Sequence, residues 1–321
     1  MKLVIIIPAY NEEKFIEYVI KSMPDQIKGI DEIMTLVIDD GSKDKTAELA
    51  KTAGATVISH LHNQGLGKAF NTGLNAALEL GADIMVNIDA DGQFFSDDIP
   101  RLIHPILKNE CDFVSGDRFI KEDGSRKKPE YMSSIKFWGN KRMADLVGFI
   151  TGTSYNDVSC GFRAYSKEAM LRLNLTGKFT YTQESFLDLA NKGMEIKSIP
   201  IKVKYFSERK SRVAGSIFKY MVQTAKIIFR AYRDYRPLRF FGWLGLVFVI
   251  LGLILGFFVL IHYVKTAAFS PFIFIAFIAV YLFTLGIILW IIGLLADMFV
   301  RIRLNQEQMI YDEKRRRYTK K

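Results

Sequence analysis

Two long uncharged stretches in the C-terminal third restrict the possible folds of this chain more than any other feature. Phe240–Ile261 contains 22 residues and Ala267–Ala296 contains 30 residues, all without a charged side chain. About 20 apolar residues suffice for a helix that crosses the hydrocarbon core of a bilayer. The connection between the two stretches, His262–Thr266, is very short. The sequence therefore predicts a hairpin of two transmembrane helices, at about residues 240–261 and 267–296.

The distribution of charge separates the chain into an acidic and a basic part. Residues 209–321 carry a net charge of +13, whereas residues 1–208 carry −3. Basic residues dominate before the first uncharged stretch and after the second, and the short connection carries only Lys265. By the positive-inside rule, we expect both flanks, and with them residues 1–208, on the cytoplasmic side. A slightly acidic globular part argues against nucleic acid as a partner, so the basic residues indicate membrane lipids.

This pattern predicts four parts along the chain. Residues 1–208 form a globular domain, and 209–239 a basic juxtamembrane segment with an amphipathic helix. Residues 240–296 hold the two transmembrane helices, and 297–321 a basic cytoplasmic tail. Glycines at 242, 245, 252 and 256 could pack helices within the hairpin or between copies of the chain, so a homo-oligomer is possible. Cys111 and Cys160 predict core packing and no disulfide framework.

The globular part alternates apolar runs with helical segments through short links. This alternation is typical of an α/β fold, with a parallel sheet and helices on both faces. We expect five strands in the first half of the domain, at Lys2–Ile7, Ile33–Ile38, Ala55–Ser59, Ile84–Ile88 and Cys111–Ser115.

Acidic and amide side chains follow the strand predicted at Ile84–Ile88. Asp89, Asp91 and Gln93 alternate along the chain, and alternate residues of an extended segment share a face. Ligands of α/β sheets bind beyond the carboxyl ends of strands, and three such oxygens suit Mg²⁺ or Mn²⁺. An ordinary Asp/Gly turn is the alternative. Carboxylates also follow the second strand, and several carboxylates at one sheet edge would repel unless a cation or hydrogen-bond donors lay between them.

Six motifs in the globular part resemble those of a known family. PAYNEE, IDDGSKDKT, NQGLGKAFNTG, NIDADGQF, SGDRF and VSCGFRAYS occur in this order between residues 8 and 166. With them the chain resembles the family 2 glycosyltransferases, which have the GT-A fold, a Rossmann-like mixed sheet with flanking helices. Within that family it is most similar to the polyprenyl-phosphate glycosyltransferases, such as dolichyl-phosphate mannose synthase. The resemblance covers about residues 1–215.

The resemblance implies roles for individual residues. The nucleotide sugar would be bound by Pro8, Ala9, Tyr10, Glu12, Asp39, Asp40, Lys68 and Asp89. Asp89, Asp91 and Gln93 would hold the metal and the donor diphosphate, and with Arg118 they form the predicted catalytic set. The acceptor phosphate would be bound by Arg118, Arg163, Arg209 and Arg212. The family places a further arginine after the loop at residues 120–131, for which Arg126, Lys127 and Lys136 are candidates here. An internal pair between Asp157 and Arg163 is the alternative to an acceptor role for Arg163.

The class of acceptor is indicated by Gln183 and Glu184. Inverting glycosyltransferases that use a sugar hydroxyl usually carry a catalytic aspartate at this place, because a hydroxyl needs a general base. This chain resembles the polyprenyl-phosphate branch of the family, which also lacks this aspartate. A phosphate monoester, with a second pKa of about 6, is already mostly an oxyanion at neutral pH. An acceptor phosphate therefore needs positioning rather than deprotonation.

We therefore predict a membrane-anchored, metal-dependent, inverting hexosyltransferase. It would move a sugar from a GDP- or UDP-linked donor to a polyprenyl phosphate at the cytoplasmic face, for glycan or glycoprotein assembly. GDP-mannose and dolichyl phosphate are the first choice of substrates. A glycosyltransferase with a lipid or glycan hydroxyl acceptor is one alternative. A non-catalytic membrane protein that binds nucleotide sugars is the other.

Overall fold

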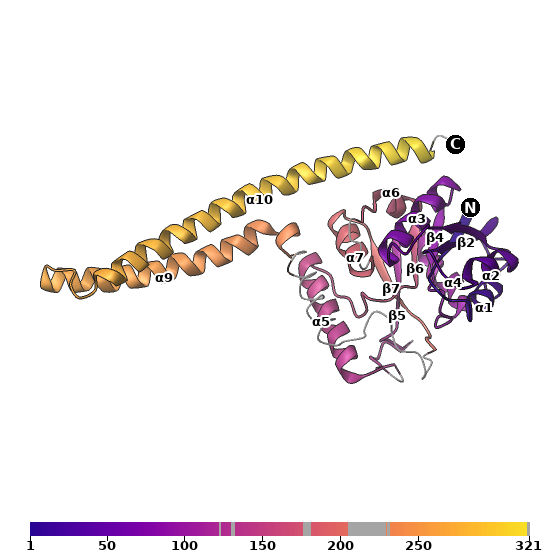
Figure 1. The fold of residues 1–321 in the computed structure, drawn as a ribbon, viewed down its shortest axis with the longest axis horizontal. Helices are drawn as coiled ribbons and strands as arrows, with labels where there is room; N and C mark the ends of the chain where they lie inside the picture. The colour runs from indigo at the N-terminus through magenta and orange to yellow at the C-terminus, as the bar shows by residue number, and fades with distance from the viewer. Residues whose placement is uncertain (122, 130–131, 176–180, 205–228, 230–231, 320–321) are drawn as a thin grey trace. The chain divides into compact units, whose positions relative to one another are not determined.

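The computed structural model describes residues 1–121, 123–129, 132–175, 181–204, 229 and 232–319. It divides into two compact units (Figure 1). The first unit comprises Met1–Val222 together with Ile310–Lys321, and the second comprises Gln223–Met309. The predicted basic juxtamembrane segment at 209–239 lies largely outside the described residues, and Arg209 and Arg212 lie wholly outside them.

The first unit is built on a seven-stranded sheet in the order β3-β2-β1-β4-β6-β5-β7. Strand β6 is antiparallel to both of its neighbours, β4 and β5, and the other pairs are parallel. The α/β prediction is confirmed, and β6 makes the sheet mixed. The strands are β1 Lys2–Ala9, β2 Glu32–Asp39, β3 Thr56–Ser59, β4 Ile84–Asn87, β5 Phe113–Asp117, β6 Arg163–Ser166 and β7 Ile196–Pro200.

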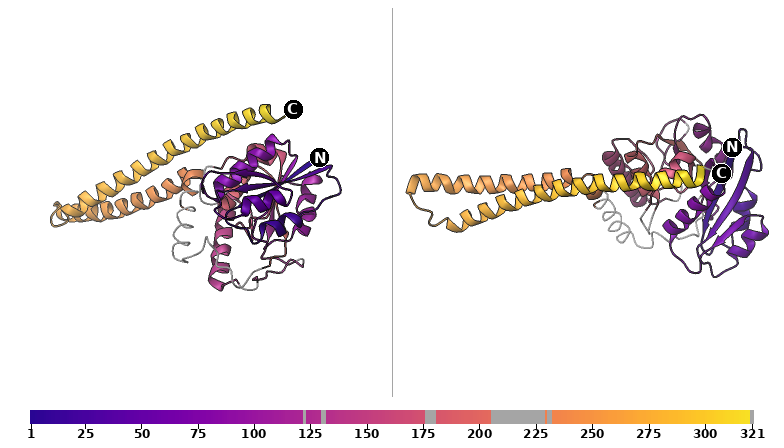
Figure 2. Two further views of the ribbon diagram at one scale, coloured as in Figure 1. Left: turned by 45° about the vertical axis from the view of Figure 1, so that its right-hand side comes forward. Right: turned by 90° about the horizontal axis from the view of Figure 1, so that it is seen from above.

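Helices cover both faces of this sheet (Figure 2). Because both faces are buried, the inner strand β1 is apolar almost throughout rather than alternating. On one face its side chains join a core with helices α1 (Ile16–Lys21) and α4 (Ile99–Leu107). On the other face lies α3 (Leu66–Glu79), where a Cβ atom at Gly73 would stand 3.1 Å from Ile6. Gly73 therefore lets α3 approach the sheet closely.

The remaining elements of the first unit follow the carboxyl ends of strands or flank the outer strands. They are α2 Thr46–Thr52, the 3₁₀ turn η1 Ser96–Asp98, α5 Ser134–Thr151, α6 Lys167–Arg172 and α7 Thr182–Asn191. Cys111 and Cys160 are free and buried, as predicted. Helix α10 (Ile273–Thr319) contributes its last turns to this unit. There the Tyr311 hydroxyl donates to Glu168 at 2.9 Å, and the Lys314 ammonium donates to the carbonyl of Leu173 at 3.0 Å.

The second unit contains the two predicted long apolar helices. Helix α9 spans Pro237–Thr266 and α10 spans Ile273–Thr319, and both are long and apolar enough to cross a membrane. The second begins six residues later than predicted, after a turn that contains Pro271, and it continues past Ala296 without a break. Within the hairpin, Gly245 and Gly252 lie against the backbone of α10, so these two glycines pack the helices of one chain.

Candidate active site

An acidic pair follows β4, the middle strand of the seven-stranded sheet. Burial, and next the charge of Asp91, raise the pKa of Asp89 to about 7. Gly92 has a φ of 69°, which turns the chain back after Asp91, and the Asp91 carboxylate accepts a hydrogen bond from the Gln93 amide at 3.1 Å. Two carboxylates that disfavour each other's ionisation in this way form a site that a cation would stabilise.

The donor set around Asp89 suits a hard divalent cation. Among the described residues, no three His, Cys, Asp or Glu side chains are arranged to hold a metal ion. A metal here would therefore rest on two carboxylates and on neutral or substrate oxygens. Mg²⁺ and Mn²⁺ are commonly bound in this way, by one or two carboxylates completed by phosphate oxygens. The carboxylates of Asp89 and Asp91 fit such a cation by their chemistry, and Gln93, the third predicted ligand, follows two residues after Asp91.

Gly161 lies directly behind Asp89 and was not predicted as a site residue. A Cβ atom on Gly161 would come within 2.6 Å and 2.7 Å of the two Asp89 carboxylate oxygens. The antiparallel pairing of β4 with β6, in which Asn87 lies opposite Arg163, brings the two segments together. The Gly161 carbonyl accepts a hydrogen bond from the buried Asn87 amide at 2.7 Å. In the sequence, the sign of this close approach is the pair Cys160-Gly161, a glycine just before β6.

The predicted nucleotide side is formed by the segments after β1 and β2. The Asn11 and Glu12 amides donate to Ser42 and Thr46 at 2.9 Å and 2.8 Å, so the motifs PAYNEE and IDDGSKDKT lie side by side. One oxygen of the buried Asp39 carboxylate accepts from the Ser42 amide at 3.1 Å, and the other has no partner among the described residues. Asp39 can therefore accept a further hydrogen bond.

Asp40 is engaged with the protein itself. One of its oxygens lies 2.7 Å from His60 Nδ1 and accepts from the Gln64 amide at 2.9 Å, and the other accepts from the Gly65 amide at 2.8 Å. The structure thus uses this buried carboxylate to fix the loop between β3 and α3. We place Asp40 behind the nucleotide side rather than in contact with a nucleotide.

The other predicted donor-side residues lie around the same strand ends. Pro8 and Ala9 end β1, and Tyr10 and Glu12 are half-buried beyond it. Lys68 is exposed in the first turn of α3, after Gly65, which has a φ of 94°.

The residue that indicates the class of acceptor, Gln183, is buried at the start of α7. Its side-chain carbonyl accepts a hydrogen bond from the Thr182 hydroxyl at 2.8 Å.

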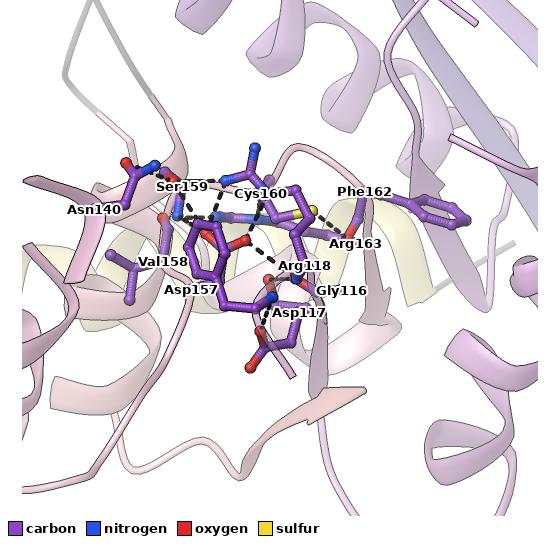
Figure 3. A network of polar contacts seen from close by, with 12 residues as sticks. Gly116, Asp117, Arg118, Asn140, Asp157, Val158, Ser159, Cys160, Phe162 and Arg163 are labelled. Atoms are coloured by element: carbon purple, nitrogen blue, oxygen red, sulfur yellow. Dashed lines mark hydrogen bonds and ion pairs between the residues drawn. The ribbon is translucent and has the colours of Figure 1, made fainter. Parts of the chain in front are cut away.

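Arg118 is held by a network beyond the end of β5 (Figure 3). Its guanidinium donates to both oxygens of Asp157, at 2.6 Å and 2.9 Å, and to the Ser159 hydroxyl at 2.8 Å. That hydroxyl can donate to the Asn140 side chain at 3.1 Å. Burial alone would raise the pKa of Asp157, but the charge and hydrogen bonds of Arg118 bring it below its usual value. The charge of Arg118 also opposes the rise in the pKa of Asp89, so the two side chains share one electrostatic environment.

A second cation lies within electrostatic range of Arg118. Burial, and next the charge of Arg118, lower the pKa of Lys136, a half-buried residue of α5. Among the described residues, the Lys136 ammonium has no hydrogen-bond or ion-pair partner. Of the other two candidates for the second acceptor cation, Arg126 is bound to Asn156 at 2.8 Å and Lys127 is exposed. Arg118 and Lys136, whose charges disfavour each other, therefore form a cationic pair.

Arg163, predicted to bind the acceptor phosphate, is fully buried. Its guanidinium donates to the main-chain carbonyls of Cys160 and Val158 at 2.7 Å and 3.0 Å (Figure 3). It also donates to the main-chain carbonyl of Thr182 at 2.7 Å. This arrangement leaves no surface for a phosphate, so we assign Arg163 to holding these segments together and leave it out of the acceptor site. The alternative of an Asp157–Arg163 pair does not fit either, because the partner of Asp157 is Arg118.

Solved structures share this fold. Glucosyl-3-phosphoglycerate synthase from Mycobacterium tuberculosis, in complex with Mn²⁺, UDP and glucosyl-3-phosphoglycerate, matches with a TM-score of 0.52 at 22% identity. The match covers 71% of this chain and 79% of the other. The mixed sheet and the acidic end of β4 define a glycosyltransferase with the GT-A fold. The family model described as glycosyl transferase family 2 matches residues 4–173. The chain belongs to this family.

Two relatives extend the comparison. A UDP-N-acetylglucosamine–dolichyl-phosphate N-acetylglucosaminyltransferase from Methanococcus voltae is 36% identical over 221 residues, which cover 63% of this chain and 85% of the relative. Glycosyltransferase AglJ from Haloferax volcanii is 29% identical over 314 residues, which cover 95% of each chain. The second match therefore includes the two long apolar helices.

Proposed function

We propose that this glycosyltransferase transfers a sugar from a nucleotide sugar to a polyprenyl phosphate. The cationic pair of Arg118 and Lys136 carries the proposal. The half-buried Lys136 ammonium has no partner among the residues that the structure describes, and the charge of Arg118 disfavours it further, so a bound anion would stabilise it. The name of the Methanococcus relative, a dolichyl-phosphate N-acetylglucosaminyltransferase, supports an acceptor of this class. Gln183 supports it further, because no carboxylate stands at this position to act as a general base.

On the donor side, Asp39 accepts a hydrogen bond from the base or the ribose, and Tyr10 contacts the base. Asp89 and Asp91, with Gln93, would hold Mg²⁺ or Mn²⁺ together with the donor diphosphate. When bound, such a metal stabilises the negative charge on the departing nucleoside diphosphate as a Lewis acid. The complex of the Mycobacterium enzyme with Mn²⁺ and UDP supports a divalent metal in this fold.

On the acceptor side, Arg118 and Lys136 orient the phosphate. A phosphate oxygen forms a bond to the anomeric carbon as the bond to the diphosphate breaks, so one displacement inverts the configuration. No proton has to be removed, because the phosphate monoester is already an anion at neutral pH. Asp157 keeps the Arg118 guanidinium in place through two hydrogen bonds.

The membrane supplies the acceptor in this proposal. The two long apolar helices anchor the chain, and the basic residues that flank them put the catalytic unit at the cytoplasmic face. A lipid phosphate in that leaflet is the acceptor of the proposed transfer.

The test uses the full-length protein in nanodiscs, with labelled donors and either dolichyl phosphate or diacylglycerol as acceptor. GDP-mannose is our predicted donor, and UDP-N-acetylglucosamine, the donor in the name of the Methanococcus relative, is compared with it. We expect product with dolichyl phosphate and none with diacylglycerol. Lys136→Met should raise KM for dolichyl phosphate, whereas Lys141→Met, an exposed lysine of the same helix, should not. Transfer to diacylglycerol alone would contradict the proposal and favour a hydroxyl acceptor.

A further inference from the structure

Asn87 is a polar side chain in an otherwise apolar, fully buried strand. It ends β4, two residues before Asp89, and it is 0% exposed. Its amide nitrogen donates to the Gly161 carbonyl at 2.7 Å and to the Tyr181 hydroxyl at 2.8 Å, while its amide oxygen has no partner within the part of the chain that the structure describes. A buried amide with an unpaired oxygen is less favourable for the fold than a leucine of similar size. Core stability alone therefore does not account for an asparagine here.

Tyr181 completes the contact around the Gly161 carbonyl. Its hydroxyl accepts from Asn87 and donates to that carbonyl at 3.4 Å. Its ring stacks on Phe70 of α3, with centroids 4.1 Å apart and planes 7° from parallel, so the hydroxyl has a fixed place. Asn87 and Tyr181 together hold the Gly161 carbonyl from two elements that are far apart in the sequence.

The same glycine contacts the metal-binding carboxylate on its other side. A Cβ atom on Gly161 would lie 2.6 Å from one Asp89 oxygen, so its Cα is in contact with the carboxylate. A shift of the Gly161 backbone would consequently shift or free Asp89. Residues beyond the ligands that orient them in this way typically change metal affinity 10- to 100-fold when mutated.

We propose that Asn87 and Tyr181 are positioning residues that fix Gly161 and, through it, the Asp89 carboxylate. Their effect is on metal affinity, because neither side chain is exposed to the nucleotide or the acceptor. The inference rests on the metal role in the proposed function. It does not depend on which acceptor the enzyme uses.

The test measures Mn²⁺ binding to the full-length protein in detergent by electron paramagnetic resonance, with Mn²⁺ alone and with Mn²⁺ plus UDP. In Asn87→Leu and in Tyr181→Phe, we expect the Kd for Mn²⁺ to rise at least about tenfold. The matched control is Asn71→Leu, which removes one hydrogen bond of 3.1 Å to the Leu175 carbonyl and does not touch Gly161. Its Kd should equal that of the wild type.

Enzyme kinetics give a readout that a merely destabilised fold would not produce. In Asn87→Leu, saturating Mn²⁺ should restore kcat while the KM for Mn²⁺ stays raised. An unchanged Kd in either variant, with a wild-type thermal unfolding midpoint, would overturn the inference. If the wild type bound no Mn²⁺ in both conditions, the inference and the metal role would fail together. Transfer to another acceptor would overturn the proposed acceptor alone.

Discussion

The carboxylate of Asp89 lies against the backbone of Gly161, 72 residues further along the chain, with no room between them for a methyl group. Real Cβ atoms essentially never come as close to a neighbour as the 2.6 Å that an alanine at this position would impose. The contact arises because β6 pairs antiparallel with β4, which sets the loop before β6 beside the residues after β4. The loop before the antiparallel strand β6 thus forms one side of the acidic site.

Gly161→Ala should therefore abolish sugar transfer while the sheet stays folded. The added methyl group has to displace the Asp89 carboxylate, and a misplacement of about 1 Å at a reacting centre can lower the rate 100-fold. Initial rates with saturating donor and Mn²⁺ check this. The control is Gly139→Ala on α5, where a Cβ atom meets nothing within 4 Å. That variant should keep full activity and gain about 0.5–1 kcal/mol in the free energy of unfolding.

Metal binding should weaken in mild acid. The pKa of Asp89 is raised to about 7, first by burial and then by the charge of Asp91, so the carboxylate takes up a proton below this pH. A proton competes with the metal, and for a single proton the apparent Kd for Mn²⁺ should rise about tenfold for each pH unit below 7. Calorimetric titration at several pH values between 5.5 and 8.5 measures the slope. A Kd independent of pH in this range would contradict the prediction.

The same raised pKa predicts how the metal-free fold responds to pH. The folded state disfavours ionised Asp89, so the free energy of unfolding in chelator should decrease as the pH rises from about 4 through 7. Asp89→Asn removes this dependence. At pH 8 in chelator, the variant should unfold at a higher temperature than the wild type although it transfers no sugar.

Arg118→Met should destabilise the catalytic unit as well as reduce transfer. It leaves Asp157, which is fully buried, without its bidentate partner, and breaking a buried ion pair costs about 3–5 kcal/mol. Because Asp157 has a lowered pKa, its contribution is present above the unfolded pKa of about 3.9 and is lost as the pH falls through the folded value. The difference in unfolding free energy between wild type and variant should therefore be full at pH 7 and shrink below pH 4.

A matched substitution separates the buried pair from a general loss of positive charge. Arg126→Met removes an exposed arginine that binds the Asn156 side chain. We expect a cost below about 1 kcal/mol, as for an ordinary hydrogen bond at the surface. Equal destabilisation by Arg118→Met and Arg126→Met in denaturant titrations at pH 7 would count against the role given to Asp157.

The sequence predicts the acidic end of β4 because the pattern is local. An apolar run is followed by carboxylate and amide side chains at alternate positions. It does not predict β6, because Arg163–Ser166 is four residues long and contains arginine and serine. The burial of Arg163 depends on carbonyls that converge from separate segments, one of them 19 residues away at Thr182. For the same reason the contact of Gly161 with Asp89 follows from the strand pairing and not from either motif alone. Local patterns identify strand ends, whereas the partners of a charge depend on topology.

Two glycines of helix α9 offer a test of the transmembrane hairpin. A Cβ atom on Gly252 would stand 2.8 Å from the Phe283 backbone nitrogen and 2.9 Å from the Ala279 carbonyl oxygen, whereas on Gly256 its nearest neighbour is the Ala279 Cβ at 3.9 Å. Gly252→Ala must push α9 and α10 apart, since backbone atoms cannot move aside as a side chain can, and small residues are what allow such helices to approach. Gly256→Ala fits as an ordinary van der Waals contact. In nanodiscs, hydrogen exchange of the backbone amides of residues 279–290 should be faster in Gly252→Ala than in the wild type. It should be unchanged in Gly256→Ala. Equal exchange in the two variants would mean that the hairpin does not pack through Gly252.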